Sequence, residues 1–131
     1  MIYLLIIICF TISGFSESIM DKLQFHYYDS IFNKLKNKLF WNPEISWKNK
    51  YKNGNPEEGE KFRFSSSLFV GLTDGWHLFK LIKNTSLFFG VFLIFSLSYN
   101  IWLSMLLSII LRVIYGMIFT LFYDVILEKK K

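Results

Sequence analysis

The sequence predicts an all-α, polytopic membrane protein with about three transmembrane helices and one amphipathic interfacial helix. The 131 residues are 53% hydrophobic and 20% aromatic, with 15 Phe and only 2 Pro, which is more apolar surface than one soluble core of this length normally buries. The apolar residues concentrate at residues 2–15 and 68–127, and a strongly polar stretch, 34–63, separates them. We therefore expect a single membrane domain over residues 1–131.

The first apolar run, residues 2–15, is shorter than the roughly 20 residues that span a bilayer. A cleaved signal peptide fits the small residues Ser13 and Gly14, but no Lys or Arg precedes the run. A retained first span or signal anchor would extend over residues 1–20. The sequence favours the retained span.

Residues 18–40 are predicted to form an amphipathic helix. Apolar side chains recur there at helical spacing on one side, namely Tyr28, Ile31, Phe32, Leu35 and Leu39. Such a helix can lie in the membrane surface with its aromatic side among the headgroups. The alternative is that it simply continues the first span into the cytosol.

A basic and aromatic loop completes residues 18–64. Pro43 ends the preceding helix, and Asn42 is placed to cap a short helix that runs to about Asn53. Aromatic residues interleaved with lysines beside membrane spans are typical of an interfacial belt that meets anionic headgroups. Nucleic-acid binding by base stacking is the disfavoured alternative. The predicted interfacial residues are Trp41, Trp47, Tyr51 and Trp76.

Residues 65–131 predict a helical hairpin of two spans. No proline interrupts residues 65–100, so one long helix is expected there, with its span at 78–97, followed by a last span at 101–127. Polar or small residues recur every four positions, which lets helices approach closely and could support a homo-oligomer. They are Asn100, Ser104, Ser108, Arg112, Gly116, Thr120 and Asp124.

The lysines predict the orientation. They gather between Lys34 and Lys52 and again at residues 129–131. Because basic loops stay in the cytoplasm, we expect a multi-pass inner-membrane protein with its N-terminus outside and its C-terminus in the cytoplasm.

One polar motif stands just before the second apolar stretch, Thr73-Asp74-Gly75-Trp76-His77. Its acid and imidazole lie one helical turn apart, so Asp74 and His77 are the catalytic candidates. In a tight hairpin Asp124 reaches the same level. Imidazole and carboxylate side chains are suitable metal ligands, and a bound metal could act on a lipid headgroup. The metal candidates are His26, Asp29, Asp74, His77 and Asp124. The simpler alternative is that Asp74 and His77 bond each other at a helix kink.

Arg112 is the other residue that needs an explanation. It falls deep in the last predicted span, where an unpaired charge is costly and usually functional. A structural, hydrogen-bonded arginine is favoured over a residue of an ion pathway.

Two motifs carry a resemblance to a known family. Phe40-Trp41-Asn42-Pro43 with Ser46-Trp47-Lys48-Asn49-Lys50-Tyr51, followed by the motif at residues 73–77, resembles a family of uncharacterised small bacterial and phage-encoded membrane proteins. The resemblance covers roughly residues 20–81 and leaves the last span unmatched. It implies a membrane protein and carries over no activity or cofactor.

The leading functional hypothesis is a non-catalytic interaction or structural protein of the lipid bilayer. The first alternative is a membrane-embedded, metal-dependent enzyme that acts on a lipid headgroup, which depends on the metal candidates. The second is a small channel or transporter, which depends on Arg112 alone. The sequence decides neither whether the protein is an enzyme nor which cofactor it would use.

Overall fold

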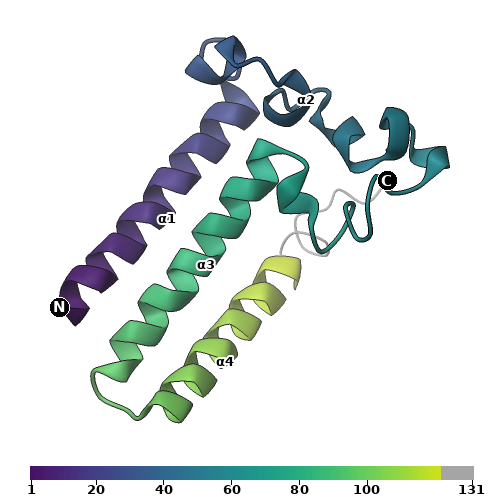
Figure 1. Cartoon of the computed structure of the whole chain (residues 1–131). Coiled ribbons are helices and arrows are strands. Elements are labelled where there is room, and N and C mark those ends of the chain that lie inside the picture. The colour runs from purple at the N-terminus through teal and green to yellow at the C-terminus, as the bar shows by residue number, and fades with distance from the viewer. Residues whose placement is uncertain (122–131) are drawn as a thin grey trace. The chain divides into compact units, whose positions relative to one another are not determined.

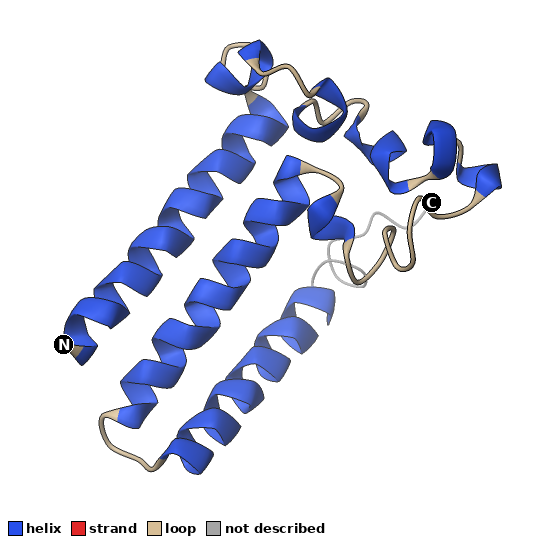
Figure 2. Ribbon diagram, viewed as in Figure 1, coloured by secondary structure: helices blue, strands red, loops and turns tan. Residues whose placement is uncertain are grey.

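The structure is a computed structural model that describes residues 1–121, and its three long helices are α1 (Ile2–Phe25), α3 (Gly75–Ser96) and α4 (Ile101–Thr120) (Figure 1). No strand occurs among the described residues, where Tyr51 and Glu60 form an isolated bridge (Figure 2). The all-α prediction is therefore confirmed. Short helices occupy the connecting segment, residues 26–74: η1 (Ile31–Lys34), α2 (Lys38–Trp41), η2 (Ser46–Lys50), η3 (Lys52–Gly54), η4 (Pro56–Glu58) and η5 (Val70–Leu72).

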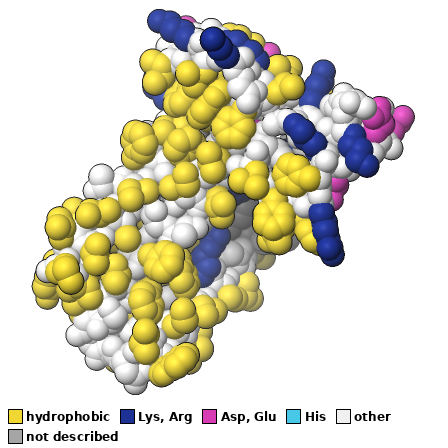
Figure 3. All heavy atoms as spheres, in the orientation of Figure 1, with side chains coloured by type: hydrophobic (Ala, Val, Ile, Leu, Met, Phe, Trp, Pro, Cys, Tyr) yellow, Lys and Arg dark blue, Asp and Glu magenta, His cyan; other side chains and the backbone are white. Residues whose placement is uncertain are grey.

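Within residues 1–121, three helices are long and apolar enough to cross a membrane: α1, α3 and residues Ile101–Ile118 of α4. At about 1.5 Å per residue, such lengths match the hydrocarbon core of a bilayer. Many of their large apolar side chains are exposed, as lipid contact requires. On the face shown in Figure 3, hydrophobic side chains are spread over the long helices, whereas most charged ones lie over the connecting segment.

The chain divides into two compact units, which are described separately. The first joins Met1–Cys9 with the chain from Leu87 onward, and the second is Phe10–Ser86. The prediction of a single domain concerns how these units pack together and stays a prediction.

In the first unit, α3 and α4 are joined by a short turn at residues 97–100. Asn100 ends this turn and caps α4, because its Oδ1 accepts a hydrogen bond from the Leu103 amide at 3.0 Å. The buried residues of the unit include small ones, Gly90, Ser104 and Ser108. Small residues allow close helix packing in a membrane. The rest of the predicted span at 101–127, from residue 122 onward, lies outside the described residues.

In the second unit, α1 and α3 run antiparallel. The buried Leu23 near the end of α1 packs in one cluster with Trp76 near the start of α3. Earlier in α1, Glu17 accepts a hydrogen bond from Lys83, which lies later in α3, at 2.6 Å. The core of this unit is thus built between the two helix ends that adjoin the connecting segment.

The prediction of one amphipathic helix over residues 18–40 is wrong, because the described chain has no continuous helix there. Helix α1 continues to Phe25, and the chain then turns at Ser30, whose amide and hydroxyl both donate to the Tyr27 carbonyl. The apolar side of that predicted helix included Tyr28 and Ile31, which are 59% and 73% exposed, whereas Tyr27 is 3% exposed. Burial of Tyr27 on the α1–α3 core therefore outweighs the local helical pattern.

Two other helix boundaries also differ from the sequence predictions. The helix expected from Asn42 to Asn53 is replaced by η2 and η3, because Tyr51 between them is extended, with φ −116° and ψ 155°. The long helix expected at residues 65–100 begins only at Gly75. Before it, the Ser65 hydroxyl bonds outside its own segment, to the Lys50 carbonyl, which competes with helix formation.

Candidate functional site

Asp74 caps the N-terminus of α3. Its Oδ1 accepts a hydrogen bond from the His77 amide at 2.9 Å, and its carbonyl accepts the first helical bond from the Leu78 amide at 3.1 Å. Aspartate is among the preferred residues at this position because the first amides of a helix have no partner within it. The negative charge is also favourable beside the helix N-terminus.

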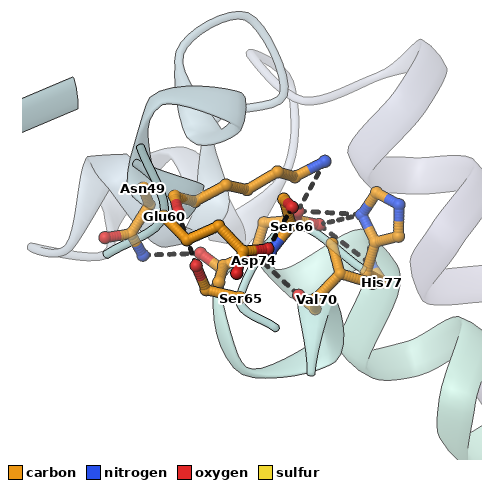
Figure 4. A network of polar contacts seen from close by, with 9 residues as sticks. Asn49, Glu60, Ser65, Ser66, Val70, Asp74 and His77 are labelled. Carbon is orange, nitrogen blue, oxygen red and sulfur yellow. Dashed lines mark hydrogen bonds and ion pairs between the residues drawn. The ribbon is translucent and has the colours of Figure 1, made fainter. Parts of the chain in front are cut away.

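The same carboxylate holds the His77 ring. His77 Nδ1 lies 2.8 Å from both Asp74 oxygens (Figure 4). Because an ionised carboxylate only accepts hydrogen bonds, Nδ1 is the nitrogen that carries the proton. Asp74 is 2% exposed as a residue, whereas the His77 side chain is 29% exposed. The imidazole therefore has a fixed orientation and an accessible edge.

Several groups around Asp74 favour its charged form. Burial by itself raises the pKa of the carboxyl group, but the hydrogen bonds from the His77 ring and amide, and the nearby charges of His77 and Lys50, bring the pKa below its ordinary value of 3.8. The Lys50 ammonium lies 4.0 Å from Asp74 Oδ2. Asp74 is thus an ionised, nearly buried acid at neutral pH.

Hydrogen bonds within the connecting segment, and one to the residue before Asp74, hold Lys50 beside Asp74. The Lys50 carbonyl accepts hydrogen bonds from the Ser65 hydroxyl at 2.6 Å and from the Lys61 amide at 3.0 Å. Asn49 donates its side-chain amide to the Thr73 carbonyl at 2.6 Å, and its Oδ1 accepts from the Lys61 ammonium at 2.6 Å. Figure 4 shows Asn49 and Ser65 in this network.

Glu60 stabilises the turn at residues 63–69, which follows it in the chain. Its carboxylate accepts hydrogen bonds from the Phe64 amide at 2.8 Å, from the Ser66 amide at 3.1 Å and from the Ser66 hydroxyl (Figure 4). The Ser66 hydroxyl bond, together with the two amide bonds, holds the pKa of Glu60 below its usual value of 4.5. These bonds also hold Phe64 at its positive φ of 64°.

A pocket opens beside this network, with a volume of about 290 Å³. Its lining combines a carboxylate, an imidazole, an ammonium group and two indole rings. Its lining residues all belong to the second unit: Gln24, Pro43, Ser46, Trp47, Lys50, Asp74, Trp76 and His77.

The remaining metal candidates do not join Asp74 and His77 in the described part of the chain. His26 and Asp29 are exposed in the connecting segment. Among the described residues, no group of three or more His, Cys, Asp or Glu side chains is arranged to hold a metal ion. Asp124 lies outside the described residues, so the five-residue metal site stays a prediction.

The predicted interfacial aromatic residues have different environments. Trp47 and Trp76 line the pocket, and Tyr51 pairs with Glu60 across the isolated bridge. Trp41 instead packs on the core of the second unit, with its ring stacked on Phe32 at 5.2 Å between ring centres. Its placement in the membrane interface, like that of the other three, stays a prediction.

Arg112 is exposed in the middle of α4. Its guanidinium carbon lies 5.4 Å from the centre of the Tyr115 ring, on the next helical turn. A cation–π contact of this kind partly compensates an exposed charge on an apolar helix.

An ion pair that the sequence interpretation missed lies within two candidate spans. The Lys83 ammonium is 2.6 Å from Glu17 Oε1. The available signal was the acid Glu17 in one apolar helix and the base Lys83 in another, at positions that face each other when α1 and α3 run antiparallel. Ionisable residues within spans usually pair in this way.

In comparisons with protein-family models, with curated proteins and with solved structures, no match to the chain was found. The structure itself gives the class: among the described residues, three helices are long and apolar enough to cross a membrane, which is compatible with a multi-pass membrane protein. Its most elaborate polar site adjoins the start of α3.

Proposed function

We propose that the protein is a small, non-catalytic membrane protein that acts by binding, through the part of the connecting segment that is fixed on the start of α3. The supporting observation is the engagement of Asp74. This residue, a catalytic candidate by sequence, caps α3, holds the His77 ring and lies beside Lys50. Its carboxylate supports a binding surface rather than taking part in chemistry.

The protonation state of Asp74 supports the same proposal. A general acid must carry a proton at the working pH, and catalytic carboxyl groups of that kind have raised pKa values. The pKa of Asp74 is lowered, because bonds and charges from His77 and Lys50 outweigh its burial. The group is therefore suited to an electrostatic and structural role.

A second candidate function, a metal-dependent enzyme that acts on a lipid headgroup, is favoured by His77. Its Nδ1 is occupied by Asp74, which leaves Nε2 as the ring nitrogen for a metal or a proton. A carboxylate behind an imidazole is the usual support of metal-ligating histidines.

Metal analysis of the detergent-purified chain separates the two functions. We expect far less than one zinc, manganese or iron ion per chain, and no change in metal content in His77→Ala or in the exposed control His26→Ala. One metal ion per chain that is lost in His77→Ala, but kept in His26→Ala, would contradict the non-catalytic proposal and support the enzyme.

The proposed setting is the inner membrane, with the N-terminus outside, the connecting segment in the cytoplasm, and anionic lipid as a partner. The support is the excess of lysines in the connecting segment. A homo-oligomer through the small-residue seam would have to use its later part, because Ser104 and Ser108 are buried within the chain. Arg112 and Gly116 are the seam residues that follow.

A further inference from the structure

We propose that the pocket beside Asp74 binds the phosphate group of a phospholipid, with Lys50 as its charged contact. The inference rests on the proposed function, since it names a ligand for the proposed binding surface. Its test is separate, because metal content and phosphate binding are measured independently.

The pocket lies where two candidate membrane spans end. Gln24 enters it from the last turn of α1, and Trp76 and His77 enter it from the first turn of α3. These are the ends of two candidate spans that pack together within the second unit. A pocket between span ends faces the headgroup region of the bilayer.

The charges around the pocket favour an anion. Two lysines besides Lys50 lie close to tryptophans of the lining. The Lys48 ammonium is 5.7 Å from the centre of the Trp47 ring, and the Lys80 ammonium is 4.8 Å from the centre of the Trp76 ring. The opposing carboxylate in the lining, Asp74, is nearly buried and bonded to His77.

Other acids near the pocket do not reverse this balance. Glu44 follows the lining residue Pro43 but is not part of the lining, and its carboxylate is bonded to the Tyr28 hydroxyl at 2.6 Å, so its one charge stands against three lysines. The lysine in the lining and the two beside its tryptophans therefore outnumber the nearby acids and favour an anion. Ammonium groups bind phosphate as point charges, so they do not need a rigid geometry.

The lining also offers neutral hydrogen-bond donors and flat apolar walls. Gln24 and Ser46 can donate to phosphate oxygens. Trp47 and Trp76 provide indole rings, which favour the interface because one edge is polar and the rest apolar. In a phospholipid, the phosphodiester can accept hydrogen bonds from these donors, and the attached glycerol can pack on the indole rings.

An apolar surface next to the site favours a lipid over free phosphate. η5 packs against α3, since a methyl group at Gly71 would lie 3.4 Å from both the His77 carbonyl oxygen and Leu81 Cδ2. Nearby apolar side chains remain uncovered, with Leu72 63% and Leu81 55% exposed. Acyl chains of a lipid held by its phosphate would cover such a surface.

Tryptophan fluorescence can test the site, because two of the four tryptophans line the pocket. The full chain in an uncharged maltoside detergent is titrated with dioctanoyl phosphatidylglycerol, dioctanoylglycerol and inorganic phosphate at constant ionic strength. We expect a saturable change with the phospholipid and none with dioctanoylglycerol. Lys50→Gln should weaken phospholipid binding by about tenfold, as the loss of one charge-assisted contact predicts, and Lys50→Arg should restore most of it.

Lys52→Gln is the matched control, because it removes an exposed lysine of the same segment that does not line the pocket. It should leave the affinity within about twofold. Circular dichroism checks that each variant is folded, and Lys50→Arg keeps the test decisive if Lys50→Gln unfolds. Phospholipid binding at least tenfold tighter than that of inorganic phosphate supports a lipid site, and equal affinities support a phosphate site for the free ion. Equal binding of dioctanoylglycerol, or equal effects of Lys50→Gln and Lys52→Gln, would overturn the proposal.

Discussion

At the scale of single residues, the charge of Asp74 has a consequence for stability against pH. Burial raises the pKa of its carboxyl group, but the hydrogen bonds from His77 and the charges of His77 and Lys50 together lower it in the folded chain. A lowered folded-state pKa means that the ionised group stabilises the fold fully above the unfolded pKa, near 3.8, and loses this effect as the pH falls through the folded value.

Asp74→Asn tests this consequence, since asparagine can still cap a helix but carries no charge. At pH 7 we expect the variant to unfold more easily than wild type, by about 1–2 kcal/mol, because the hydrogen bonds to a charged acceptor are lost. Below pH 4 the difference should shrink. The measurement is unfolding in detergent, followed by fluorescence at several pH values.

Glu57→Gln is the control for Asp74→Asn, because Glu57 is exposed in the same segment. Its stability should stay within about 0.5 kcal/mol of wild type at every pH. A difference between Asp74→Asn and wild type that stays constant from pH 7 to pH 3 would show that the charge of Asp74 has no stabilising role.

The residues of the site differ in how far the sequence could predict them. The contact between Asp74 and His77 is local, and an acid just before an apolar helix is a recognisable cap. Lys50 was missed as a site residue because its position depends on contacts such as Asn49 with Thr73, far along the chain. Nothing in the local pattern distinguishes Lys50 from the lysines beside it.

At the scale of elements, Gly75 lets the connecting segment pack on the start of α3. A Cβ atom at Gly75 would lie 2.8 Å from Cε3 of Trp41 and 3.3 Å from Cδ1 of Leu23. Real Cβ atoms do not approach so closely, and the Trp41 ring is held by its stacking on Phe32. The absence of a side chain at Gly75 is thus required by packing.

Gly75→Ala should therefore destabilise the protein by about 1–3 kcal/mol through overpacking, despite the better helix propensity of alanine. Thermal unfolding in detergent measures the effect. Gly14→Ala is the matched control, because Gly14 lies within α1 and an added Cβ there meets no atom within 4 Å. It should be neutral or slightly stabilising. If both variants melt like wild type, the contact with Trp41 is not as tight as described.

The ion pair between α1 and α3 is a second feature of the elements that can be tested. Glu17 and Lys83 lie within candidate spans, where an unpaired charge is costly. Glu17→Met and Lys83→Met should each destabilise the protein, and the double variant should lose less than the sum, with a coupling of about 1 kcal/mol or more. Unfolding of the four proteins in detergent gives this coupling.

Asp21 provides the control for that cycle, as an exposed acid on the same helix. Asp21→Met combined with Lys83→Met should give additive effects. Additive effects in the Glu17 cycle as well would mean that the pair does not stabilise the packing of α1 on α3.

The long helices could be predicted from the sequence, whereas the short ones could not. Twenty or so apolar residues without proline predict a helix whatever surrounds them, as α3 and α4 show. The connecting segment lacks such runs, so its shape follows from long-range burial and side-chain bonds. Tyr27, which is buried instead of Tyr28, and Ser65, which bonds to Lys50, show both effects.

At the scale of the whole molecule, the proposed orientation can be tested through the two ends of α3. Because α3 is a single apolar helix from Gly75 to Ser96, the segment before it and the turn after it should lie on opposite sides of the membrane. The lysine-rich segment is expected in the cytoplasm, and the turn at residues 97–100 outside.

Single-cysteine variants in a Cys9→Ser background give the measurement, since Cys9 is the one native cysteine. Lys48 in the connecting segment and Ser98 in the turn are both exposed. A membrane-impermeant maleimide added to intact cells should label Ser98→Cys and leave Lys48→Cys unlabelled until the membrane is opened. The reverse pattern would invert the proposed orientation, and labelling of both sites in intact cells would show that α3 does not cross the membrane. With Lys48 inside, the phosphate site would face the cytoplasmic leaflet, where anionic lipids attract basic segments.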